Sequence, residues 1–351
     1  MNNPIKIMVI DDSILFRNRL IKNLEKDLRF QVVGWASNAF DAMAKLPAYK
    51  PDVLTLDIEM PGMTGLEFLK KLFPLHPIPV ILVSSLNMGV FDALNAGAVD
   101  FVRKPDEAPQ AKEEFLKALT AKLIIASRSH VRLPSSTSSS FPSSAEAPSA
   151  KQTLSVKSSN QLIAIGASTG GTEAILEVVR QFPADMPGVV ITQHMPAGFT
   201  AMYAERLNRL CRMEAKEAKD GDRVRRGLIL LAPGGLQMRV VRLGDGYAVH
   251  CTKDERVNGH CPSVDVLFDS VALTARQNAI GILLTGMGAD GAAGLLRMRK
   301  NGAYTIGQDK ATCVVYGMPM EAYKIGAVCL QSPLSSIPQA VFRQLSASSG
   351  R

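Results

Sequence analysis

The sequence lacks the features that mark exported, membrane-spanning or zinc-scaffold proteins. Its 351 residues include five cysteines, an odd number with no CxxC pair, so we expect neither a disulfide framework nor a standard zinc site. The apolar stretches are strand-length and interrupted by glycine or polar residues, so we expect no membrane insertion. The first residues, MNNPIKIMVIDDS, lack a basic segment followed by a long apolar run. We therefore expect no secretory signal and a cytoplasmic location.

Aromatic side chains are also scarce, at 6% of the chain, and the formal net charge of +8 is unevenly distributed. Residues 1–127 carry equal numbers of acidic and basic side chains, so the basic excess lies in the remainder. An excess this mild, without interleaved aromatics, does not by itself indicate a nucleic-acid partner, and we expect none. It would favour an acidic protein surface. Arg206, Arg209 and Arg212 are candidates for that surface, although a solvated helical face explains them equally well.

One segment has almost no large apolar side chains and divides the chain in two. Residues 128–159 are rich in serine and proline, a composition that cannot bury a core. This predicts a flexible linker between one domain at residues 4–121 and a second at residues 160–345. The length of the chain suits two domains of ordinary size.

Short apolar runs alternate with helical patterns on both sides of this segment. In the first half the predicted strands are Ile5–Ile10, Val32–Ala36, Val53–Leu56, Val80–Val83 and Phe101–Val102. The predicted helices between and after them are Ile14–Asp27, Ala39–Leu46, Gly65–Phe73, Val90–Ala96 and Gln110–Ser127. The second half repeats the pattern with strands at Gln161–Ile165, Val189–Thr192, Leu228–Ala232 and Ile280–Leu284, and it reads as βα throughout. Such alternation predicts an α/β fold: two doubly wound domains with mostly parallel sheets.

Acidic side chains follow two strands of the first half. Asp11 and Asp12 follow the first strand and Asp57 the third, and the carboxyl ends of parallel strands meet at one edge of a sheet. Three carboxylates there repel one another unless a cation neutralises them, and oxygen ligands of this kind suit Mg²⁺. Lys104 and the hydroxyl of Ser84 end two further strands at the same edge. Together these groups predict a site at which Asp57 accepts a phosphoryl group.

Residues 4–121 resemble the receiver domain of bacterial two-component response regulators. The resemblance rests on IDDS, on LDIEMPGMTGLEFL around Asp57, on Ser84 in VSS, on Phe101 and on Lys104-Pro105. It implies that a sensor histidine kinase phosphorylates Asp57. It further implies a Mg²⁺ ion held by Asp11, Asp12, Asp57 and the backbone carbonyl of Glu59. The residues implied in the switch are Ser84, Phe101 and Lys104.

A glycine-flanked serine follows the first strand of the second half. Gly166-x-Ser168-x-Gly170 fits the G-x-S-x-G turn, in which glycines permit a sharp strand-to-helix turn that exposes a nucleophilic hydroxyl. Such a turn can also bind phosphate, but the spacing fits neither G-x-G-x-x-G nor the Walker pattern. A serine that merely caps the following helix remains an equal alternative for this motif alone.

Two more strand ends favour a nucleophile. His194 ends the strand in VVITQHMPAGFT, and Asp290 follows AIGILL in the loop TGMGADGAAG. Serine, histidine and aspartate from three strand ends can act as nucleophile, base and orienting acid. Their order along the chain differs from that of the α/β-hydrolases, which excludes that family but not the chemistry.

Residues 160–345 resemble the catalytic domain of chemotaxis protein-glutamate methylesterases. The resemblance rests on IGASTGGTEAI, ITQHMPAGFTAMYAERL, LAPGG, PSVDVLFDSVA and LLTGMGADGAAGLL. It implies hydrolysis of glutamate methyl esters on the cytoplasmic helices of methyl-accepting chemoreceptors, with release of methanol, and deamidation of receptor glutamines. In this scheme Ser168 attacks, His194 is the base and Asp290 orients it. The backbone N–H of Met287 is the implied oxyanion donor and Thr169 helps to position His194; the esterase reaction needs no cofactor.

The joining of a switch domain, a tether and an enzyme suggests that the unphosphorylated receiver restricts substrate access to Ser168. Three other functions are compatible with parts of the sequence: a regulator with a non-catalytic effector, a nucleic-acid-binding regulator and a hydrolase of small esters. The βα pattern lacks a helix-turn-helix signature, which disfavours the second. His250-Cys251 and His260-Cys261 match no zinc spacing and are expected to be ordinary strand and loop residues.

Overall fold

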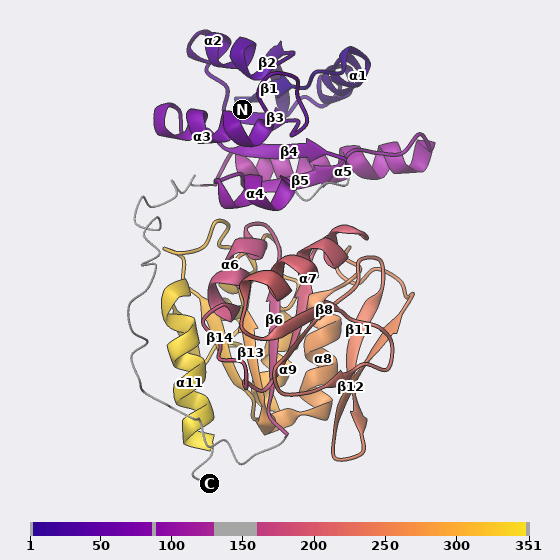
Figure 1. Cartoon of the computed structure of the whole chain (residues 1–351), viewed down its shortest axis with the longest axis vertical. Coiled ribbons are helices and arrows are strands. Elements are labelled where there is room, and N and C mark those ends of the chain that lie inside the picture. Colours follow the sequence, from indigo (N-terminus) through magenta and orange to yellow (C-terminus); the bar gives the residue numbers. More distant parts are fainter. Residues whose placement is uncertain (1–2, 86–88, 130–159, 349–351) are drawn as a thin grey trace. The chain divides into compact units, whose positions relative to one another are not determined.

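The computed structural model describes residues 3–85, 89–129 and 160–348. The chain divides into two compact units, with the boundary between residues 133 and 134. Apart from residues 128 and 129, the predicted linker lies outside the described residues. Each unit has parallel strands covered by helices (Figure 1), so the predicted class of two mostly parallel α/β domains is confirmed. Within the described ranges, none of the helices is both long enough and apolar enough to cross a membrane.

The first unit is a five-stranded parallel sheet in the order β2-β1-β3-β4-β5. Its strands are β1 (Ile5–Ile10), β2 (Phe30–Ala36), β3 (Val53–Leu56), β4 (Val80–Ser84) and β5 (Asp100–Arg103). Its helices are α1 (Ile14–Leu24), α2 (Ala39–Tyr49), α3 (Gly65–Leu75), α4 (Gly89–Asn95) and α5 (Pro109–Ala126). The middle strands are buried on both faces, as near-continuous apolar runs predict.

Two helices of this unit extend past prolines at which they were expected to end. α2 continues through Pro47 to Tyr49, and α3 continues through Pro74 to Leu75. A proline removes one helical hydrogen bond, but near the last turn the helix can continue. In α2 the carbonyl of Leu46 still accepts the N–H of Lys50, which closes that turn.

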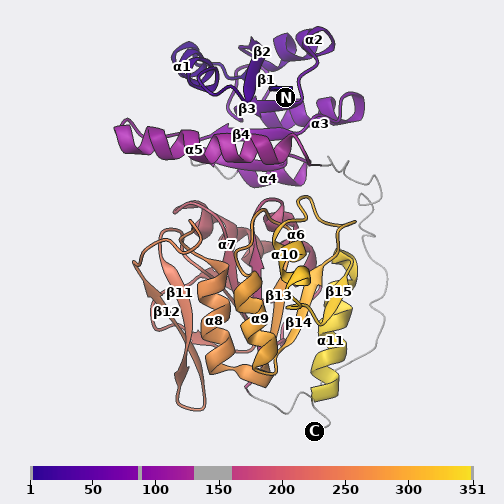
Figure 2. The same ribbon diagram turned by 180° about the vertical axis from the view of Figure 1, so that it is seen from behind.

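The second unit is a seven-stranded parallel sheet in the order β15-β14-β13-β6-β7-β10-β8. Its strands are β6 (Leu162–Ala167), β7 (Gly188–Gln193), β8 (Glu214–Glu217), β10 (Leu228–Leu231), β13 (Ala279–Leu283), β14 (Tyr304–Gln308) and β15 (Leu330–Ser332). Its α-helices are α6 (Gly171–Val179), α7 (Phe199–Leu210), α8 (Val264–Thr274), α9 (Ala292–Lys300), α10 (Met318–Lys324) and α11 (Ile337–Ser348). Short 3₁₀ turns occur at Arg276–Asn278 and Leu334–Ser336. Helices α8 and α9 lie side by side against the sheet (Figure 2) and share one apolar core with it.

The expectation that the second half is βα throughout is wrong in one region. β9 (Arg223–Val224), β11 (Gln237–Leu243) and β12 (Gly246–Thr252) form a separate three-stranded antiparallel sheet. The two longer strands are joined by the tight turn at Gly244, which has a left-handed φ of 61°. Met238 and Val240 of β11 are buried against α8, so this sheet closes one side of the core.

The strand orders place a break in direction inside each sheet. In the first unit the chain leaves β1 toward β2 on one side and continues through β3, β4 and β5 on the other. In the second unit β6 leads to β7 on one side, while β13 leads to β14 on the other. Loops diverge at such a switch point and leave a crevice beyond the carboxyl ends of the strands. The residues that follow β1 and β3, and those that follow β6 and β13, therefore lie where doubly wound folds bind ligands.

Candidate functional site

The predicted carboxylate cluster is present at the switch point of the first unit. Ligand oxygens of Asp11, Asp12 and Asp57 lie within 4.8 Å of one another. Asp11 and Asp57 are 2% and 5% exposed, whereas Asp12 is exposed. The Nζ atom of Lys104 lies 2.5 Å from Oδ2 of Asp57 and 2.9 Å from Oδ2 of Asp11. The structure thus brings four of the predicted residues together from the ends of three strands.

The electrostatics of this cluster are those of crowded, partly buried acids. Burial raises the pKa of Asp11 above its usual value, although Lys104 opposes that shift. Burial also acts against the charge of Lys104, but its hydrogen bonds to Asp11 and Asp57 raise its pKa overall. Asp12 and Glu59 line one surface pocket, and the N–H of Glu59 donates to Oδ1 of Asp57 at 3.3 Å. An all-oxygen donor set beside an open pocket fits a hard divalent cation such as Mg²⁺.

The two further residues expected in a receiver switch lie on neighbouring strands. Ser84 ends β4 and is fully buried, and within the described residues its Oγ has no hydrogen-bond partner. Its carbonyl accepts the N–H of Lys104 at 2.8 Å, which links the ends of β4 and β5. Phe101 in β5 is 4% exposed, with the ammonium of Lys122 5.7 Å from its ring centre.

In the second unit, Ser168 lies in a turn between β6 and α6 that requires its glycines. Gly170 has a left-handed φ of 75°, which disfavours other residues, and it precedes the first turn of α6. A Cβ at Gly166 would lie 2.2 Å from the side chain of Val264, so only glycine lets β6 approach α8 this closely. The carbonyl of Ser168 accepts the N–H of Gly171 at 2.7 Å. The half-buried serine is thus held at the end of β6.

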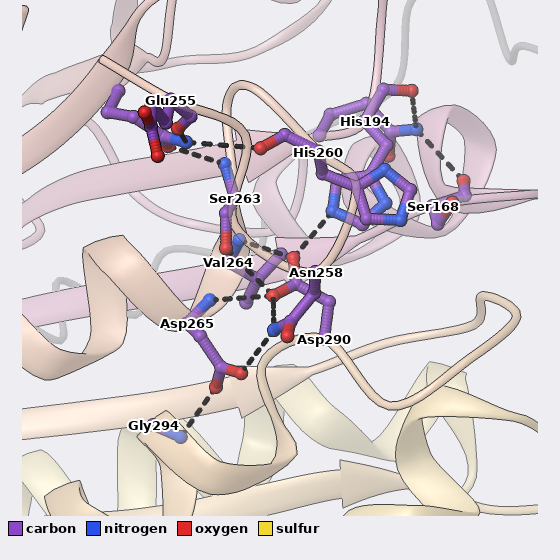
Figure 3. Close-up of polar contacts among 12 residues, drawn as sticks. Ser168, His194, Glu255, Asn258, His260, Ser263, Val264, Asp265, Asp290 and Gly294 are labelled. Atoms are coloured by element: carbon purple, nitrogen blue, oxygen red, sulfur yellow. Dashed lines mark hydrogen bonds and ion pairs between the residues drawn. The ribbon is translucent and has the colours of Figure 1, made fainter.

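Strand pairing brings His194 next to this serine. β6 and β7 are parallel, with Ala167 paired to Gln193, so the next residues along the two strands are Ser168 and His194. The side-chain amide of the buried Gln193 donates to the carbonyl of Ser168 at 2.9 Å and to that of His194 at 3.3 Å. Figure 3 places Ser168 beside the imidazole of His194.

Asp290 completes the arrangement from the far side of the imidazole. Its Oδ2 lies 2.7 Å from Nε2 of His194, and both side chains are nearly buried, at 2% and 7% exposure. Burial alone would raise the pKa of Asp290, but the hydrogen bond and charge of His194 hold it well below the usual range, with help from Asn258 and Ser263. Asp290 is therefore a carboxylate and only accepts hydrogen bonds. In a neutral imidazole the proton between the two residues then lies on Nε2, and Nδ1 carries the lone pair.

Four residues that sequence reasoning did not single out hold this carboxylate. Oδ1 accepts from Nδ2 of Asn258 and Oγ of Ser263, both at 2.8 Å, and from the N–H of Asp265 at 3.3 Å. Oδ2 also accepts the N–H of Val264 at 2.7 Å. The N–H groups of Val264 and Asp265 belong to the first turn of α8 (Figure 3). The first N–H groups of a helix have no acceptor within the helix, and this end of a helix favours negative charge. The PSVDV segment carried this signal, because a serine before an apolar helical run is a typical helix N-cap.

The TGMG turn lies directly against Ser168. A Cβ on Gly286 would lie 2.7 Å from Cβ of the serine. The carbonyl of Gly286 accepts N–H groups from Gly317 at 3.0 Å and Met318 at 2.8 Å. The carbonyl of Gly286 and the N–H of Met287 belong to one planar trans peptide and point in opposite directions. Anchoring the carbonyl therefore also fixes the direction of this N–H. The side chain of Met287 is 45% exposed.

Thr169, expected to help position His194, is 4% exposed, and its carbonyl accepts the hydroxyl of Thr285 at 3.0 Å. This bond ties the serine turn to the strand end that leads into the TGMG turn. Thr169 therefore lies next to Ser168 and against the loop that follows β13.

The arginines considered for an acidic partner are not one surface. Arg206 is 4% exposed and forms an ion pair with Glu173 at 2.6 Å, so its charge is not available to a partner at the surface. Arg212 lies beyond the end of α7 at Leu210. Arg209 and Arg212 are exposed, but the expectation of a single three-arginine helical face is wrong.

Comparison with known proteins agrees with both halves of this geometry. The profile of the CheB methylesterase family matches residues 163–341, and that of the response regulator receiver domain matches residues 7–116. A protein-glutamate methylesterase/protein-glutamine glutaminase of Syntrophomonas wolfei is 52% identical over 97% of both chains. One of the same name from Syntrophotalea carbinolica is 48% identical over 99% of both.

Among solved structures, the CheB methylesterase catalytic domain of Thermotoga maritima is 33% identical and superposes with a TM-score of 0.52. It covers 53% of this chain and 99% of its own length. The sequence similarity extends through the receiver as well as the catalytic half. The chain therefore belongs to the CheB methylesterase family, with a response regulator receiver domain preceding the catalytic domain.

Proposed function

We propose that this chain hydrolyses glutamate methyl esters on chemoreceptors, releasing methanol, and deamidates receptor glutamines, in adaptation of a chemotaxis or related chemosensory pathway. The observation that carries the proposal is the meeting of Ser168, His194 and Asp290 at one switch point, in a chain similar over its whole length to enzymes named for these activities. The test is methanol release from methylated receptor membranes by the wild-type chain and by Ser168→Ala.

In the first half-reaction the hydroxyl of Ser168 attacks the ester carbonyl while Nδ1 of His194 takes its proton. Within the described residues Nδ1 is buried without a hydrogen-bond partner, so it is available as the base. Asp290 stabilises the imidazolium that forms. Collapse of the tetrahedral intermediate breaks the bond to the methoxy oxygen, the imidazolium protonates that oxygen, and methanol leaves with Ser168 acylated.

In the second half-reaction His194 takes a proton from water, which attacks the acyl-enzyme. The bond to Ser168 breaks, the serine regains a proton from the imidazolium, and the carboxylic acid product gives its proton to water as it leaves as a glutamate carboxylate. A glutamine side chain follows the same two steps with ammonia as the leaving group. No step requires a metal or an organic cofactor.

We propose that the backbone N–H of Met287 stabilises the oxyanion of the tetrahedral intermediate. Substitution of Gly317 tests this role without changing a residue of the triad. A Cβ at Gly317 would lie 2.7 Å from the carbonyl of Gly286 and 2.9 Å from Cα of Met287. The φ of Gly317 is −110°, so alanine is not strained by the backbone itself. We expect Gly317→Ala to displace this peptide and lower kcat by roughly 10- to 100-fold, with little change in KM.

A matched control for this substitution is Gly246→Ala. An added Cβ there meets only the carbonyl of Leu243, at 4.0 Å, and the hairpin is remote from Ser168 in the fold. This variant should keep wild-type kcat and KM in the same methanol assay. Equal kcat for Gly317→Ala and Gly246→Ala would remove the Met287 peptide from the mechanism.

In the receiver, we propose that a sensor histidine kinase phosphorylates Asp57 in the cytoplasm. Asp11, Asp12, Asp57 and the carbonyl of Glu59 would hold Mg²⁺, which neutralises phosphoryl oxygens when bound. Lys104, already 2.5 Å from Asp57, would pair with a phosphoryl oxygen. Ser84 and Phe101 would carry the switch, since an unpartnered buried hydroxyl can move to a new acceptor.

We further propose that the receiver, residues 4–121, restricts access of substrate to the catalytic domain, residues 160–345, until Asp57 is phosphorylated. Removal of residues 1–127 should then raise the basal rate of methanol release above that of the unphosphorylated full chain. The comparison is made at equal concentrations of folded protein, established by circular dichroism. A truncated chain no faster than the full chain would eliminate this form of control.

A further inference from the structure

His260 covers the imidazole of His194. The two rings are stacked, with centroids 3.6 Å apart and planes inclined by only 10° (Figure 3). This is van der Waals contact over a whole ring face, and it comes from a loop 66 positions further along the chain (260 minus 194). His260 itself is half-buried, whereas residues 253–259 before it are exposed. An aromatic face of this kind restricts rotation of the neighbouring ring about χ2 and excludes water from that side.

The same loop also reaches the acid of the triad. Asn258 has a left-handed φ of 54°, a conformation that asparagine tolerates better than most residues. This conformation directs its Nδ2 to Asp290 at 2.8 Å and to Asp265 at 2.7 Å, so one amide lies between two carboxylates. Without a donor there, the two acids would face each other: burial raises the pKa of Asp265, and the charge of Asp290 adds to that shift.

The loop is fixed to the body of the domain by a buried side chain. Gln237, fully buried in β11, donates from Nε2 to the carbonyls of Glu255 and His260, each at 3.1 Å. Its Oε1 accepts the N–H of Ser263 at 2.8 Å. Backbone hydrogen bonds between Val257 and His260 close the turn in both directions. The ring of His260 and the amide of Asn258 are therefore held in place from within the protein, as a preorganised site requires.

We propose that the Val257–His260 turn positions the catalytic pair, with His260 holding the imidazole of His194 by stacking and Asn258 holding the carboxylate of Asp290 by hydrogen bonding. Two ring orientations of a histidine differ by half a turn about χ2, and only one directs Nε2 to Asp290 and leaves Nδ1 for the serine. The stack and the carboxylate select that orientation together.

This inference rests on the proposed function and is tested in the full-length chain. His260→Ala removes the ring, and we expect kcat for methanol release to fall by roughly 5- to 50-fold with KM nearly unchanged. His260→Phe restores a flat ring without a titratable group and should recover most of the loss. The control is His250→Ala, because His250 lies on β12 and its half-exposed side chain is paired with Asp220. It should retain wild-type activity.

If His260 only filled space, a flat ring at this position would have no advantage over an aliphatic side chain of similar size. His260→Leu fills space without a flat ring, so stacking predicts that the Phe variant turns over faster than the Leu variant at equal thermal midpoints. Equal kcat for Phe and Leu, or wild-type kcat for Ala, would overturn the proposal. Asn258→Asp keeps the size and the tolerance of left-handed φ but replaces the donor by a third acceptor, and wild-type kcat for it would overturn the part assigned to Asn258.

A receptor-independent readout separates this proposal from the assigned substrate. A fluorophosphonate labels an activated serine without any chemoreceptor, and its labelling rate reports the serine–imidazole pair alone. Slower labelling of His260→Ala than of wild type supports the positioning role even if receptor membranes release no methanol. Equal labelling rates would contradict the role, whereas absence of methanol release from the wild-type chain would contradict only the proposed substrate.

Discussion

Substitution of Ser168 by alanine should reduce methanol release from methylated receptor membranes by roughly 10³-fold or more, to the background of the assay. In the proposed mechanism the serine supplies the oxygen that forms the acyl-enzyme, and the pairing of β6 with β7 places it beside His194. The fold should be unaffected, since Oγ of Ser168 supports no hydrogen bond in the described residues and the turn is held by backbone groups. The measurement is the initial rate of methanol formation at matched protein concentrations.

Ser346→Ala provides the control for this comparison. Ser346 lies on α11, is exposed, and donates only to the carbonyl of Phe342 among the contacts described here. Its rate should equal that of the wild type. Methanol release by Ser168→Ala at the wild-type rate would remove the serine mechanism, and with it the roles of His194 and Asp290.

Substitution of Asp57 by asparagine should abolish phosphoryl incorporation and, with it, any increase in esterase rate that follows phosphorylation. Asparagine keeps the size of the side chain but has a single, uncharged acceptor oxygen, so it has no anionic oxygen to attack a phosphorus atom. It also removes one of the charges that surround Lys104, so the ammonium keeps only Asp11 as a close anionic partner. Incorporation is measured with a radiolabelled acyl phosphate and Mg²⁺, and basal methanol release should remain at or above the wild-type unphosphorylated rate.

Asp52→Asn is the matched control, because Asp52 is an exposed acid just before β3 that accepts the N–H of Lys6. Asparagine can accept the same hydrogen bond, so phosphorylation should proceed as in the wild type. Labelling of Asp57→Asn to the wild-type level would place the phosphoryl group elsewhere.

The residues that the sequence predicted best are those that follow buried strands. An apolar run with Asp11, Ser168 or His194 at or shortly after its end identifies a strand end, and parallel strands bring such ends to one edge of a sheet. Neither inference needs knowledge of side-chain packing. The same local rules predicted the first and third strands of the receiver with their exact bounds, while helix ends near Pro47 and Pro74 moved because the last turn tolerates a lost hydrogen bond.

What the sequence did not predict depends on contacts between distant segments. Asn258 and His260 lie in a loop whose composition indicates only a turn, and their partners on the catalytic side are 32 and 66 positions away (290 minus 258, 260 minus 194). Their placement depends on Gln237, a polar residue in a strand of the antiparallel sheet that the βα pattern omitted. The role of Gly317 likewise depends on its contact with the carbonyl of Gly286, a residue distant from it in the sequence.

The central claim is that one chain couples phosphorylation of Asp57 to ester hydrolysis at Ser168. It is tested most directly by the initial rate of methanol release from methylated receptor membranes by the full-length chain, with and without an acyl phosphate and Mg²⁺. We expect measurable release without the phosphoryl donor and a clear increase with it, and the increase should be absent in Asp57→Asn. Absence of methanol under both conditions, or the same rate in both for the wild-type chain, would contradict the account.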